Sequence, residues 1–184
     1  MYLGEEIHVL GNWFIIHFTE NNGMAFGFQF GGDWGKFVLS SFRIVAIAAL
    51  IWYLIKLFKD SAPKGVVICM SLILAGAIGN VIDSLFYGLV FSESYQSLAT
   101  LFPENGGYAP FLFGKVVDML YFPVLEGFLP SWIPIWGGEY FIFFRPVFNI
   151  ADSSITIGVF TLILFYRNFF KDSGNQEVPD SNVA

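Results

Sequence analysis

Long apolar runs alternate with short polar segments along most of this chain. Three runs, at residues 37–58, 65–90 and 141–165, reach the roughly 20 residues that a helix needs to cross a bilayer. We therefore predict a membrane all-α bundle with three transmembrane helices. Residues 91–140 are rich in glycine, proline and aromatic residues but contain no comparable run, so we expect them to form an external loop.

A different pattern occupies residues 1–35. Two aromatic and β-branched runs, WFIIHFTE and MAFGFQF, lie on either side of Asn21, Asn22 and Gly23. An Asn-Gly step between such runs favours a hairpin, because both residues tolerate a positive φ. The sequence therefore predicts a small external β-element, a hairpin that rests on the membrane surface.

Positive charges orient the predicted helices. Lys56, Lys59 and Lys64 crowd the link between the first two runs, and Arg167 and Lys171 follow the third. Cytoplasmic loops of membrane proteins carry the excess of Lys and Arg, so both places are predicted to be cytoplasmic. The N-terminal segment and the loop before the third run then face outside.

The two ends of the chain carry further expectations. The polar tail, residues 172–184, is expected to be disordered and cytoplasmic. The N-terminus lacks the charged and then apolar pattern of a signal peptide. An N-terminus outside the membrane without an export signal predicts that a preceding helix is missing, and residues 1–184 are expected to form a single membrane domain.

Composition narrows the chemistry. The chain is 55% hydrophobic and carries a net charge of −6, so it has no basic face for nucleic acid. Its single cysteine, Cys69, excludes an internal disulfide, and His8 and His17 lie outside any metal-ligand motif. The metalloprotease motif H-E-x-x-H and the serine motif G-x-S-x-G do not occur. We expect no cofactor, no metal and no nucleic-acid partner.

Acidic residues occur where they are costly. Asp83 and Asp152 lie within predicted spans, and Asp118 lies in GKVVDML, a short apolar stretch that leads back to the membrane. A charge at the centre of a spanning helix costs about 2.5–3.5 kcal/mol, so such residues generally face a bundle interior or a cavity. One isolated acid could be a polar tether between helices, but three in a short chain favour a functional role.

The spacing of polar residues adds detail. Asn80 and Asp83, like Asn149 and Asp152, are three positions apart and so share a helix face. Arg145 and Asn149 are four apart, which also places them on one predicted face. We expect a polar cavity between these helices.

Two small residues lie close to the first of these polar pairs in the sequence. Gly76 and Gly79 precede the first of these pairs and would let another helix approach closely.

Two carboxylates that share a site tend to hold one proton between them, so one can activate water while the other polarises a carbonyl. A proton relay or ion site in a transporter uses buried acids as well, and this alternative stays open.

Four blocks in order, ENNGMAFGF, GAIGNVID, GKVVDML and FRPVFNIADSSITIG, resemble the bacterial lipoprotein signal peptidases (signal peptidase II). The resemblance covers residues 3–167. It implies an aspartic endopeptidase of the bacterial inner membrane that cleaves prolipoproteins just before a cysteine carrying diacylglycerol. The partners would be this lipidated substrate and membrane lipid, and the protein would be a multi-pass monomer with its active site toward the external face.

The resemblance also assigns residues. It places the catalytic pair at Asp118 and Asp152. Supporting or substrate-binding positions map onto Asn21, Gly23, Arg43, Asn80, Asp83, Asn149 and Ala151. Asp83 is expected to be a structural acid beside the pair.

Three departures from the family pattern modify these expectations. The family usually has four membrane helices, and we expect the first of them to be missing here. Ser84 stands where the family typically has arginine, a charge that Arg145 would partly replace. A long aromatic insertion separates Asp83 from Asp118 and would enlarge an external lid. A catalytically impaired homologue that binds lipoproteins therefore remains an alternative, and a small proton-coupled transporter a weaker one.

Overall fold

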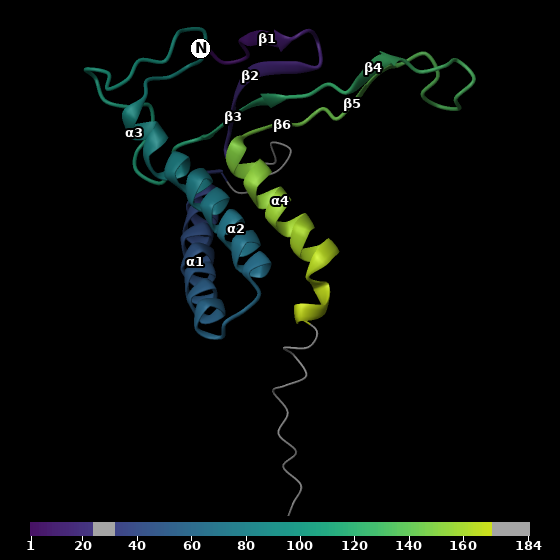
Figure 1. The fold of residues 1–184 in the computed structure, drawn as a ribbon. Coiled ribbons are helices and arrows are strands. Elements are labelled where there is room, and N and C mark those ends of the chain that lie inside the picture. Colours follow the sequence, from purple (N-terminus) through teal and green to yellow (C-terminus); the bar gives the residue numbers. More distant parts are fainter. Residues whose placement is uncertain (24–31, 171–184) are drawn as a thin grey trace, which may run out of the picture.

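The structure is a computed structural model that describes residues 1–23 and 32–170. Three helices, α1 (Gly32–Lys59), α2 (Lys64–Ile82) and α4 (Ile150–Phe165), form one half of the molecule, and β-strands cover one end of them (Figure 1). Helix α2 packs against both α1 and α4. The molecule therefore has an apolar helical half and a sheet at the end opposite the α1–α2 link.

The first two predicted membrane helices are present. Trp34–Lys59 and Lys64–Val90 are long and apolar enough to cross a membrane. The second continues past α2 through a π-helical turn (η2, Asp83–Tyr87) into the short α3 (Gly88–Val90). Such a turn locally widens the helix and redirects the side chains that follow.

The third predicted span is wrong over residues 141–149. Strands β5 (Tyr140–Phe143) and β6 (Val147–Phe148) occupy this part, and α4 begins only at Ile150. The aromatic and β-branched residues here suit strands as well as an apolar helix. Helix α4 is apolar but has 16 residues, so the structure does not confirm a count of three spanning helices.

The main sheet has four antiparallel strands in the order β1-β2-β3-β6. Strands β1 (Glu6–Leu10) and β2 (Phe14–Asn21) form a hairpin, and β3 (Val116–Tyr121) pairs with the other edge of β2. The first run of the predicted hairpin is thus a strand, but its partners are β1 and β3. The second run, residues 24–30, lies outside the described residues, as does the tail, residues 172–184.

A second, two-stranded sheet pairs β4 (Leu125–Phe128) with β5 and extends sideways from the main sheet, beyond α4 (Figure 1). The predicted external loop, residues 91–140, therefore contains β3, β4 and the first residue of β5. Its earlier part is tied together by an isolated bridge between Phe91 and Leu101.

Glycines set the spacing of α2 and α4. A Cβ on Gly76 would lie 2.3 Å from the carbonyl oxygen of Ala151, and a Cβ on Gly79 would lie 3.2 Å from the Cβ of Ala151. On α4, a Cβ at Gly158 would lie 2.7 Å from the carbonyl oxygen of Cys69. The predicted close approach at Gly76 and Gly79 is confirmed, and it places the start of α4 against the C-terminal half of α2.

Candidate active site

Asp118 lies on β3 and is 4% exposed. Its Oδ1 accepts a hydrogen bond from Asn149 Nδ2 at 2.8 Å, and its Oδ2 accepts one from Asn21 Nδ2 at 3.3 Å. Thr19 pairs with Asp118 across the sheet, and its Oγ1 donates a hydrogen bond to the backbone oxygen of Asp118 at 3.3 Å. The pairing of β2 with β3 thus fixes both the backbone and the carboxyl group of Asp118.

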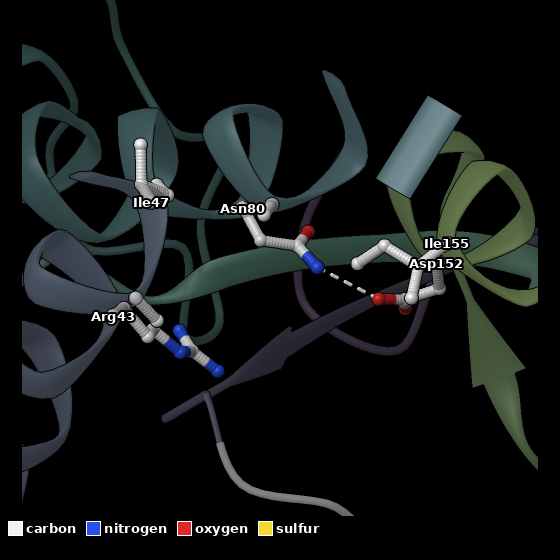
Figure 2. Close-up of a pocket in the computed structure, with 7 residues that line it drawn as sticks. Arg43, Ile47, Asn80, Asp152 and Ile155 are labelled. Carbon is white, nitrogen blue, oxygen red and sulfur yellow. Dashed lines mark hydrogen bonds between the residues drawn. The ribbon is translucent and has the colours of Figure 1, made fainter. Parts of the chain in front are cut away.

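Asp152 lies in the first turn of α4, where it forms a capping box with Asn149. The backbone nitrogen of Asp152 donates to Asn149 Oδ1 at 2.8 Å, and Asp152 Oδ2 accepts from the backbone nitrogen of Asn149 at 3.4 Å. Asp152 Oδ1 accepts from Asn80 Nδ2 at 2.7 Å (Figure 2). The start of the helix and a side chain of α2 therefore hold this carboxylate together.

The side chain of Asn149 joins the two acids. Its Nδ2 donates to Asp118 Oδ1, to Asn80 Oδ1 at 3.0 Å and to the carbonyl oxygen of Val117 at 3.3 Å. Its Oδ1 meanwhile caps the helix that carries Asp152. One amide group thus positions two carboxyl groups that come from different elements.

The surroundings of Asp118 favour its protonated form. Burial raises the pKa of Asp118 most, the negative charge of Asp152 raises it further, and hydrogen bonds from Asn21 and Asn149 oppose the rise. The result is a pKa of about 6, against an ordinary value of 3.8. The two acids therefore interact electrostatically, and Asp118 keeps its proton up to a higher pH than an ordinary aspartate does.

Asp83 has a different partner. Its Oδ2 accepts a hydrogen bond from the backbone nitrogen of Val117 at 3.2 Å, and so it ties η2 to β3 one residue before Asp118. Close contact supports the same junction, because a Cβ on Gly114 would lie 2.3 Å from the backbone oxygen of Asp83. The expected structural role of Asp83 agrees with these contacts.

Arg43 of α1 reaches the same region. Its guanidinium donates to Ser84 Oγ at 3.2 Å and to the carbonyl oxygen of Gly23. Gly23 has φ +90°, and a Cβ there would lie 2.7 Å from Arg43 Nη1, so the arginine occupies the space that a side chain would take. Buried Ser84, which stands where the family that the sequence resembles typically has arginine, is thus the partner of an arginine from a neighbouring helix.

A cavity of about 300 Å³ opens beside Asp152, between α1, α2 and α4 (Figure 2). Arg43 points from α1 toward the space that Asn80 and Asp152 border on the other side. The remaining lining residues are apolar: Ala46, Ile47, Ala77 and Ile155. A polar cavity between packed helices was predicted, and the polar residues that line this one are Arg43, Asn80 and Asp152. Within the described ranges, no cluster of three His, Cys, Asp or Glu residues could hold a metal ion.

The family model for signal peptidase (SPase) II, named Peptidase_A8, matches residues 1–168. The chain belongs to the signal peptidase II family. Family membership and the two apolar helices make it a membrane peptidase.

Curated relatives that match this chain are named lipoprotein signal peptidases. A lipoprotein signal peptidase of Porphyromonas gingivalis is 53% identical over 167 residues, which are 90% of this chain and 72% of that protein. One of Amoebophilus asiaticus is 40% identical over 163 residues, which are 88% of this chain and 65% of that protein.

Two solved structures, both described as bacterial membrane enzymes determined by the in meso method, are similar in fold. The first has a TM-score of 0.54 and 25% identity, and the match covers 100% of this chain and 80% of that one. The second has a TM-score of 0.53 and 27% identity, and its match covers 91% and 77%.

In this signal peptidase II chain, the structure brings together most of the residues that the sequence singled out. Asp118, Asp152, Asn21, Asn80 and Asn149 share one hydrogen-bond network. Asp83, Gly23 and Arg43 border it, and Ala151 packs against Gly76 and Gly79.

The expectation for Arg145 is wrong. It was placed on a helix face with Asn149, but the helix begins after Asn149, and Arg145 is exposed in the link between β5 and β6. Arg145 forms none of the hydrogen bonds that hold the described site residues, and Arg43 is the cation near Asp152 instead.

Sequence reasoning missed three residues near the site. Thr19 and the backbone of Val117 contribute hydrogen bonds that only strand pairing could reveal. Glu20, one position before Asn21, is buried and accepts hydrogen bonds from Ser94 Oγ at 2.6 Å and Lys115 Nζ at 2.8 Å. Glu20 thereby ties the segment before β3 to β2, directly beside the residues that hold Asp118.

Proposed function

We propose that this protein is an aspartic endopeptidase that removes signal peptides from prolipoproteins, with Asp118 and Asp152 as its catalytic pair. The observation that carries the proposal is the bridge through Asn149, which hydrogen-bonds to Asp118 and caps the helix turn that holds Asp152. The relatives named lipoprotein signal peptidase supply the substrate class.

The two acids take complementary roles in this mechanism. Asp118, whose pKa is raised to about 6 by burial and by the charge of Asp152, holds the shared proton and donates a hydrogen bond to the scissile carbonyl oxygen. Asp152 removes a proton from a water molecule that attacks the carbonyl carbon, and it then gives this proton to the leaving amine nitrogen as the C–N bond breaks. The amide groups of Asn80 and Asn149 keep the carboxyl groups in place while the tetrahedral intermediate forms and collapses.

The substrate in this proposal carries a diacylglyceryl cysteine, and cleavage occurs just before that residue. The position of the two acids in the fold supports this choice of substrate. The pair lies where the sheet meets the apolar helices, so water can enter from the sheet side while lipid chains lie beside the helices. A bond next to a lipid anchor would lie at this level.

We also propose that the protein lies in the bacterial inner membrane as a monomer, with the acids toward the external face. Lys56, Lys59 and Lys64 cluster at the α1–α2 link, at the end of the helices opposite the sheet. Positive charge is retained on the cytoplasmic side, which directs the sheet outward.

The direct test compares cleavage of a diacylglyceryl-modified prolipoprotein by the wild type, Asp118→Asn and Asp152→Asn. Each variant is expected to lose at least about 100-fold in kcat, the usual contribution of a positioned acid or base. Glu104→Gln, the same carboxyl-to-amide change at an exposed position, serves as the matched control. Undiminished cleavage by either aspartate variant would contradict the pair, and a wild type that binds the substrate without cleaving it would favour a binding homologue.

A further inference from the structure

The β4–β5 hairpin and its tip, residues 122–144, form an arm whose apolar side chains are uncovered. Trp132 is 79% exposed and Ile135 is 87% exposed, and other large apolar residues along the arm are exposed as well: Val124, Leu125, Phe128, Trp136, Phe141 and Phe143. Exposure of so many large apolar side chains to water is unfavourable. Apolar patches on a protein surface often mark interaction surfaces.

The arm has a defined shape of its own. Its strands pair from Leu125↔Phe143 to Phe128↔Tyr140, and the tip is closed by hydrogen bonds of Leu129 to Glu139 and of Gly138 back to Leu129. A two-stranded hairpin on its own is only marginally stable in water. A second surface that covers its apolar side chains would therefore stabilise it.

The length of α4 indicates where the arm lies. The sixteen residues of α4 make roughly 24 Å of helix at about 1.5 Å each, and the further helical turn at residues 167–170 brings this close to the roughly 30 Å of a bilayer's apolar core, so the start of α4 lies near one face of that core. The strand that leads into α4, β6, is linked to β5 by residues 144–146 only. The arm therefore leaves the protein at the lipid interface, and it extends across the direction of the helices to the side of α4 (Figure 1).

The composition of the arm fits that interface. Residues 122–144 include Trp, Tyr and Phe side chains, which concentrate at the boundary between lipid chains and water. They contain no Lys or Arg, and their two acids are Glu126, which accepts a hydrogen bond from Tyr140, and Glu139. Attraction to anionic headgroups therefore plays no part, and insertion of apolar side chains accounts for binding.

We infer that this arm binds the outer interface of the bilayer in which the helices lie, with Trp132, Ile135 and Trp136 inserted below the headgroups. The partner is the lipid surface itself, which would also cover the exposed apolar side chains of α1 and α4. Both strands of the arm lead directly to the site, through β3 to Asp118 and through β6 to Asn149. Lipid contact at the arm thus holds both acids at one depth. The inference relies on the membrane placement of the proposed function and not on the catalytic pair.

Tryptophan fluorescence tests the inference without measuring activity. Variants that keep one of the five tryptophans are placed in phosphatidylcholine bilayers that are plain, brominated near the headgroup end of the chains, or brominated near the chain ends. Single-Trp132 and single-Trp136 proteins are expected to lose most of their fluorescence with the shallow bromine and less with the deep bromine. Adding anionic lipid should leave both results unchanged.

Another tryptophan serves as a control. Trp52, exposed on α1, should be quenched more strongly by the deep bromine, which verifies insertion. Trp13 lies in the turn between β1 and β2, with its ring centroid 6.3 Å from that of Phe122, so it reports on the base of the arm. If Trp132 and Trp136 stay bright in both brominated bilayers while Trp52 is quenched, the arm lies in water or on another protein, and the inference is overturned.

A second comparison covers the case in which the single-tryptophan variants fail to fold. The wild type is compared with the Trp132→Phe/Trp136→Phe double variant, which keeps the arm apolar. Shallow quenching should be clearly weaker in the double variant. Equal quenching of the two proteins would overturn the inference. Loss of cleavage with normal quenching would instead contradict the proposed function alone.

Discussion

Asn149 makes separate use of the oxygen and the nitrogen of its side chain. The oxygen accepts from the backbone of Asp152 and so begins α4, whereas the nitrogen donates to Asp118 and Asn80. The first contact is a helix cap that stabilises the fold, and the second orients the acids. These two contributions can be separated by substitution, because serine keeps a cap acceptor but has no amide nitrogen.

We expect Asn149→Ala to reduce both stability and activity. Loss of the cap should lower the free energy of unfolding by about 1 kcal/mol, and loss of the amide should lower kcat. Asn149→Ser should recover most of the stability but little of the kcat. Unfolding in mixed micelles and prolipoprotein cleavage measure the two effects, and full activity of the serine variant would exclude a role for the nitrogen.

The raised pKa of Asp118 makes a second prediction at the scale of residues. Because the folded-state value of about 6 exceeds 3.8, this acid's contribution to stability is fully present below pH 3.8 and is lost as pH rises through 6. The same loss of the shared proton should lower kcat/KM of the free enzyme as pH rises through about 6.

Asp152→Asn separates the two causes of that shift. Removing the charge should lower the pKa of Asp118, but the pKa should stay above 3.8 because burial is the larger cause. Carboxyl-carbon NMR of labelled protein measures this pKa without catalysis. A pKa that is the same in both proteins would show that the two acids do not interact.

At the scale of elements, the contact between α2 and α4 determines where Asp152 lies. The carbonyl oxygen of Ala151, the residue before Asp152, approaches the position where Gly76 would carry a Cβ. Any side chain at that position must push the first turn of α4 away from α2. The capping box and the bond from Asn80 Nδ2 would move with that turn.

Gly76→Ala is therefore expected to lower both stability and cleavage. Its new Cβ would meet the Ala151 oxygen at 2.3 Å, and forcing an extra group into a packed interface typically costs about 1–3 kcal/mol. Gly127→Ala, in β4, is the matched control because a Cβ there meets nothing within 4 Å. Equal activity of the two variants would show that α4 can shift without moving Asp152 out of position.

At the scale of the whole molecule, local patterns predicted the parts whose structure depends on local sequence. Hydropathy located α1 and α2, and a β-branched run located β2. The same logic failed at residues 141–149, because an apolar aromatic run suits a strand as well as a helix. What decides between them is pairing with β4 and β3, which the pattern of residues 141–149 does not encode by itself.

The site shows the same division. The spacing of Asn149 and Asp152 was noticed correctly, but the reason differs, since three positions separate residues on one helix face and also the two members of a capping box. Arg145 was predicted on a helix face because the third apolar run was expected to be helical from residue 141, whereas α4 begins at Ile150. The contacts of Thr19, Val117 and Glu20 depend on strand register and packing, which no single segment encodes.

The double use of Asn149 has a consequence for antibiotic resistance. A bacterium escapes an inhibitor most easily through substitutions that weaken drug contacts and leave the target folded. On the proposed mechanism, escape at Asn149 is restricted, because one side chain caps α4 and orients the acids, so substitutions that repel a compound would also impair catalysis. Compounds that hydrogen-bond to this amide should therefore select resistant strains more slowly than compounds that rely on the apolar wall of Ala46, Ile47 and Ala77.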